Sequence, residues 1–160
     1  MKGTLLASGL GFTEGPVVMP DGSIVLCDGN VGQLLRWHEG TMSTFAETGG
    51  SPWGAVLGSN GAIYVTQGGN VPASSDQSAT PGIQRVNRDG SVELLATSIG
   101  GLELAGPNDL AFGPDGRLWF TDSGTEQDDR YALRSPGRLY VLDGTGAGDR
   151  KSTRLNSSHG

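Results

Sequence analysis

Short apolar runs alternate with glycine-containing turns along most of this chain. Three runs, at residues 23–27, 62–66 and 117–121, directly follow an Asp-Gly or Asn-Gly pair. Such pairs between apolar runs are strong signals for β-hairpins. Third runs begin after a glycine, at 33–37, 83–86 and 138–142, and fourth runs cover 43–46 and 92–96. The pattern therefore predicts antiparallel strands joined by tight turns.

One segment precedes the hairpin turn three times, at residues 14–22, 53–61 and 108–116, and its copies align without a gap. Glu14, Trp53 and Asn108 consequently occupy equivalent positions. The turn glycines recur after 39 and then 55 residues. Four-stranded units at such spacing are typical of a β-propeller, whose blades bury their faces against their neighbours. We predict an all-β fold with about three propeller blades, at residues 12–48, 49–98 and 106–148.

Composition supports short strands over long helices. The 160 residues are 35% hydrophobic and 6% aromatic, with 28 glycines and 8 prolines, and glycine and proline are the poorest helix formers. No apolar run reaches the length of a membrane span, and the N-terminus lacks the apolar core of a signal peptide. These features predict a cytoplasmic protein. The single cysteine, Cys27, lies in an apolar run and is expected to be a small buried hydrophobe.

The last residues, 149–160, depart from the repeat and resemble the translation of a sequencing adapter. We expect them to be non-native and disordered; a genuine basic disordered tail is the alternative. On this interpretation the reading frame was cut within the gene. Residues 1–148 then carry 8 basic and 16 acidic side chains, a net charge of −8 against −6 for the whole sequence. This acidity argues against nucleic acid or an anionic membrane as a partner.

The repeated position suggests a ligand site, because the first strand of each propeller blade lines the central channel. Glu14 and Asn108 would bring a carboxylate and a carboxamide into one ring, and hard oxygen ligands suit Ca²⁺ or a similar divalent ion. Taken singly, Glu14 could be a solvated loop acid and Asn108 a turn residue. Trp53 would either plug the channel or form an apolar face of the pocket. Two long loops, residues 68–81 and 123–136, are expected to overhang this end.

The segments 13–16 (Thr-Glu-Gly-Pro) and 106–122 resemble the SMP-30/gluconolactonase/LRE family. The resemblance extends over about residues 5–146. It implies a six-bladed propeller that hydrolyses lactones with one divalent cation, usually Ca²⁺, with Zn²⁺, Mg²⁺ and Mn²⁺ as alternatives. By this resemblance Glu14 matches a metal ligand, and Asn108 matches an asparagine that contacts the substrate or helps to hold the metal. Glu126 falls at the spacing of an acidic residue that contacts the sugar in some members, although an exposed loop acid fits equally.

The sequence also departs from the family pattern. Gly106 stands where sugar-lactone members carry an arginine, which argues against a gluconolactone-like substrate. The remaining asparagine and aspartate ligands, the aspartate also being the general base, are expected from later blades, so residues 1–148 would form an N-terminal half that is inactive alone. Its open sheet edges predict self-association. The alternative function is a propeller that binds a ligand or partner without chemistry.

Overall fold

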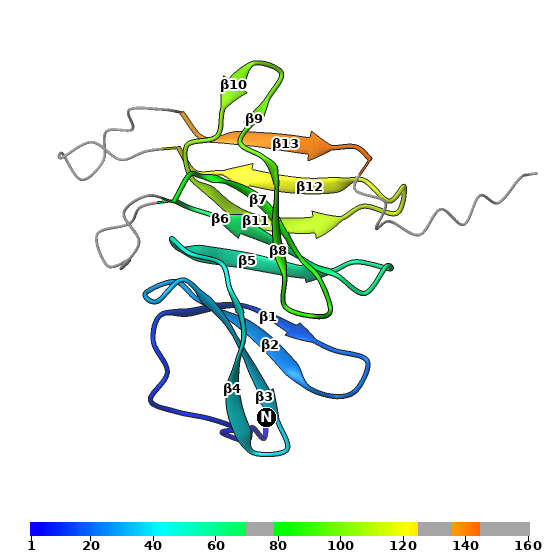
Figure 1. Ribbon diagram of the computed structural model, residues 1–160. Coiled ribbons are helices and arrows are strands. Elements are labelled where there is room, and N and C mark those ends of the chain that lie inside the picture. Colours follow the sequence, from blue (N-terminus) through cyan, green and yellow to red (C-terminus); the bar gives the residue numbers. More distant parts are fainter. Residues whose placement is uncertain (70–78, 125–135, 145–160) are drawn as a thin grey trace, which may run out of the picture.

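The computed structural model describes residues 1–69, 79–124 and 136–144. Every regular element within these ranges is a β-strand (Figure 1). The predicted all-β fold is therefore confirmed. Within the same ranges, no helix combines the length and the apolar character needed to cross a membrane.

Three antiparallel sheets make up most of the structure, and each follows the chain in simple order. The first sheet contains β1 (Thr13–Val18), β2 (Ile24–Asp28), β3 (Gln33–His38) and β4 (Thr41–Glu47). The second contains β5 (Pro52–Leu57), β6 (Ile63–Gln67), β7 (Gly82–Val86) and β8 (Val92–Ala96). The third contains β11 (Pro107–Phe112), β12 (Leu118–Asp122) and β13 (Arg138–Leu142). The strands predicted from the hairpin turns agree with these bounds to within two residues.

The first turn of each sheet has the same geometry. The Gly22 N–H donates to the Met19 carbonyl at 2.9 Å, and Gly22 has a positive φ of 81° that favours glycine. Gly61 and Gly116 repeat both features, with φ values of 79° and 78°. This local chemistry explains why the Asp-Gly and Asn-Gly pairs located the hairpins correctly.

A small hairpin of β9 (Ser98–Ile99) and β10 (Leu102–Glu103) lies between the second and third sheets. It falls in the interval that the sequence left without a strand. Its strands are only two residues long, and Gly100 and Gly101 join them with φ values of 60° and 80°. Two residues are too few to show the alternation by which strands are recognised.

The first strands of the three sheets run side by side, with β1 against β5 and β5 against β11 (Figure 1). The second sheet is therefore covered on both faces, and all five residues of β6 are buried. Their side chains alternate: Ile63 and Val65 pack toward the first sheet, whereas Tyr64 packs toward the third. The core thus consists of two apolar layers between successive sheets, as in stacked propeller blades.

Candidate functional site

A β-bulge recurs at the start of the first strand in each sheet. The register with the second strand shifts between Glu14 and Val17, between Pro52 and Ala55, and between Pro107 and Leu110. Each shifted segment contains the repeated position of Glu14, Trp53 or Asn108. Bulges commonly re-aim a side chain beside a functional site. The sequence pattern did not predict them.

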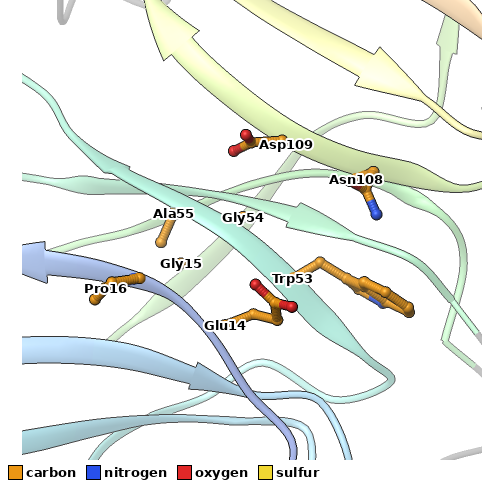
Figure 2. A pocket seen from close by; sticks show the side chains of 8 residues that line it. All are labelled: Glu14, Gly15, Pro16, Trp53, Gly54, Ala55, Asn108 and Asp109. Carbon is orange, nitrogen blue, oxygen red and sulfur yellow. The ribbon is translucent and has the colours of Figure 1, made fainter.

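The three bulges border a single cavity of about 370 Å³. In Figure 2 the strand of Trp53 runs between the strands of Glu14 and Asn108, and the indole ring extends to one side, while Asp109 points away from Asn108. The cavity is lined by residues of β1, β5 and β11: Glu14, Gly15, Pro16, Trp53, Gly54, Ala55, Asn108 and Asp109. The structure thus brings the three residues of the repeated position together, as the alignment predicted. Their roles as metal ligands or substrate contacts remain predictions.

Two glycines allow the first strands to approach closely around this cavity. A Cβ on Gly15 would lie 2.6 Å from both the Ala55 nitrogen and the Trp53 carbonyl oxygen, and Gly15 has a positive φ of 52°. A Cβ on Gly54 would lie 2.8 Å from the Asn108 carbonyl oxygen. In both cases the obstructing atoms belong to backbone and cannot easily move. Only glycine therefore permits this spacing of β1, β5 and β11.

Thr66 joins the second and third sheets at the cavity. Its side chain is fully buried. The hydroxyl accepts a hydrogen bond from the Gly54 N–H at 2.8 Å and donates one to the Asn108 carbonyl at 2.6 Å. The main chain of Asn108 is thereby fixed from a neighbouring sheet. Sequence reasoning missed Thr66, because its partner lies 42 positions away.

Asp122 fixes the same segment from the other direction. Its buried carboxylate accepts hydrogen bonds from the N–H groups of Ala105 at 2.9 Å, Gly106 at 2.8 Å and Gly124 at 2.9 Å. Charge-assisted bonds of this kind are stronger than neutral ones. Asp122 therefore holds the backbone that leads into Asn108, and it does not line the cavity itself.

A buried polar residue occupies the position of Asp122 in all three sheets. Gln67 accepts hydrogen bonds from Ser51 N–H at 2.6 Å and Gly69 N–H at 3.0 Å, and Asp28 accepts one from Asn30 N–H at 3.1 Å. Each residue stands six positions after a turn glycine. That spacing was the signal in the sequence that could have identified this structural repeat.

Cys27 lies in the first sheet at the position of Thr66 in the second. It is fully buried. Burial raises the pKa of its thiol to about 12, and the nearby Glu14 carboxylate contributes in the same direction. The expectation of a small buried hydrophobe is confirmed, since a thiol that keeps its proton is a poor nucleophile and a poor metal ligand.

The polar side chains of the cavity offer oxygen donors from Glu14, Asn108 and Asp109. No sulfur or imidazole lines it in the part of the chain that the structure describes. This donor chemistry fits Ca²⁺ better than a thiolate-seeking metal. Over residues 1–69, 79–124 and 136–144, no three or more His, Cys, Asp or Glu residues gather as a metal site.

Several predictions concern residues outside the described ranges. Glu126 is one of them, and so are most of the two long loops and the whole segment 149–160. The substrate contact assigned to Glu126 and the adapter origin of the tail remain predictions.

Solved structures of similar fold include two enzymes. A gluconolactonase from Xanthomonas campestris, XC5397, superimposes with a TM-score of 0.68 and 24% identity, covering 86% of this chain and 46% of that one. A luciferin-regenerating enzyme superimposes with a TM-score of 0.64 and 17% identity, covering 88% and 48%. This chain therefore spans about half the length of these structures, and at such identities the likeness concerns the fold.

Sequence comparison gives a more specific result. No curated protein matches the chain. The sequence of residues 12–160, however, matches the family described as the SMP-30/Gluconolactonase/LRE-like region. Because this match spans nearly the whole sequence and agrees with the fold and the repeated motifs, the chain belongs to the SMP-30/Gluconolactonase/LRE-like family.

Proposed function

We propose that this chain provides part of the active site of a metal-dependent lactone hydrolase. One observation carries the proposal: Glu14 and Asn108, which are equivalent in the repeat and far apart in the sequence, line one cavity where three sheets meet. The family and the gluconolactonase fold support the same reaction class. The substrate would be a small lactone.

In this proposal the Glu14 carboxylate and the Asn108 carboxamide oxygen hold a divalent cation, for which we favour Ca²⁺ over Zn²⁺, Mg²⁺ or Mn²⁺. Such an ion, when bound, supplies Lewis-acid polarisation of the lactone carbonyl. Asn108 also directs polar atoms at the substrate, and Trp53 contacts its ring. We assign no general base to the described residues; the resemblance places it in later blades.

The structure supports a preorganised position for Asn108. Thr66 holds its carbonyl, and Asp122 holds the two residues that precede Pro107. Because this backbone is fixed on both sides, it needs little reorganisation when a ligand binds. Such preorganisation favours catalysis over loose association.

The test measures whether the full-length protein opens the rings of a panel of lactones, with and without a chelator. Ring opening is monitored through the proton that each hydrolysis releases. We expect activity that chelation removes and Ca²⁺ restores. Glu14→Gln should lower kcat/KM by about 100-fold or more. Glu39→Gln is the matched control, because it makes the same chemical change at an exposed hairpin turn outside this cavity.

Activity that survives both the chelator and Glu14→Gln would contradict the proposal. Calcium binding or ligand binding without turnover of any lactone would instead support the alternative, a propeller that binds without chemistry. Calorimetry on the same samples distinguishes these outcomes.

A further inference from the structure

Trp53 is the one aromatic residue that lines the cavity in the described ranges, and Phe12 packs against it. Their rings meet edge to face, with centroids 5.7 Å apart and planes inclined at 68°. Phe12 is 47% exposed, and Trp53 is half-buried on the strand that runs between those of Glu14 and Asn108.

The indole is held in place on its other side as well. A Cβ on Gly68 would lie 2.6 Å from the indole nitrogen, so the ring packs directly against this backbone. The Gly68 N–H donates to the Ser51 carbonyl at 2.9 Å, which fixes the backbone in turn. Trp53 is therefore a rigid surface, and ordering it costs a ligand little conformational entropy.

The part of Trp53 that remains accessible is hydrocarbon. The indole nitrogen is buried and has no acceptor within the described residues. Trp53 therefore cannot offer its N–H to a ligand hydroxyl in this arrangement. Ala55 and Pro16 also line the cavity, whose exposed lining is otherwise mainly polar, and no Lys, Arg or His lines it in the described ranges.

We propose that the cavity selects lactones that carry an apolar substituent, seated against Trp53, over polyhydroxylated sugar lactones. That these lactones are hydrolysed rests on the proposed function. That the cavity binds them preferentially does not. Each hydroxyl of a sugar ring loses its hydrogen bonds to water when it meets a hydrocarbon surface. A lactone with an alkyl group in the same place binds about fourfold more tightly for each methylene that is buried.

Binding tests recognition without requiring turnover. Three δ-lactams, which resist hydrolysis, would be titrated into the full-length protein by calorimetry: unsubstituted, butyl-substituted and polyhydroxylated. We expect the butyl compound to bind at least about tenfold tighter than the unsubstituted one. Trp53→Ala should remove this preference, whereas Trp53→Phe should keep most of it. Trp119→Ala is the control, because Trp119 is 37% exposed on β12 and does not line the cavity.

Hydrolysis of the corresponding lactones separates the two proposals. If the butyl lactam binds preferentially through Trp53 but no lactone is opened, the proposed reaction fails and the inferred recognition stands. If gluconolactone is opened best, the reaction stands and the inferred selectivity is wrong. The selectivity is also overturned if the polyhydroxylated lactam binds tightest, if none of the lactams binds, or if Trp53→Ala weakens all three equally.

Discussion

Replacing Thr66 by valine should weaken the junction between the second and third sheets without changing the shape of the side chain. The substitution removes an acceptor of the buried Gly54 N–H and a donor to the Asn108 carbonyl. A buried polar group left without a partner costs about 1–3 kcal/mol. With two groups affected, and Asn108 only partly buried, we expect the free energy of unfolding to fall by about 2–4 kcal/mol.

Urea unfolding followed by fluorescence would measure this loss as a lower midpoint with an unchanged slope. Thr121→Val is the matched control in the third sheet. Thr121 is exposed, and its hydroxyl makes longer contacts with Asp109, at 3.2 Å and 3.5 Å. We expect the control to change stability by less than about 0.5 kcal/mol. Equal effects of the two substitutions would refute the structural role assigned to Thr66.

Three further predictions concern the residues around the site. Asp122→Asn should lower the free energy of unfolding by about 1–3 kcal/mol, because the amide NH₂ must then face at least one of the backbone N–H groups that donate to the carboxylate. An unchanged midpoint in urea unfolding would contradict this. Gly54→Ala should lower the free energy of unfolding by about 1–3 kcal/mol, since its Cβ would meet backbone at 2.8 Å. Gly137→Ala is the control: its nearest contact is at 3.6 Å, and it should change the free energy of unfolding by less than about 0.5 kcal/mol. At pH 8 the Cys27 thiol, whose pKa burial raises to about 12, should react with a disulfide reagent at least about 100-fold more slowly in the native protein than in urea; equal rates would show that it is accessible.

Much of the fold could be predicted because its signals are local. An Asp-Gly or Asn-Gly turn requires only the few residues that form it, as the Gly22 hydrogen bond to Met19 illustrates. Strand alternation is equally local, so the strands that flank these turns were placed correctly. The hairpin of β9 and β10 escaped notice because two-residue strands contain no period to recognise.

The candidate site could be predicted in part, through the repeat. The equivalence of Glu14, Trp53 and Asn108 followed from a gapless alignment, and the structure places all three on one cavity. The bulges, Thr66 and Asp122 were not predicted. A bulge depends on the register between two strands, and no single strand carries that information in its own pattern.

The sequence by itself determined where the strands and turns lie and which positions of the repeat are equivalent, because hairpin chemistry acts over a few neighbouring residues. Only the tertiary structure decided how close the first strands come and what holds them. Gly54 matters because the backbone of β11 lies against it, and Thr66 matters because its partner is the carbonyl of Asn108. Such contacts join residues some 40 or more positions apart, and they exist only once the sheets have packed.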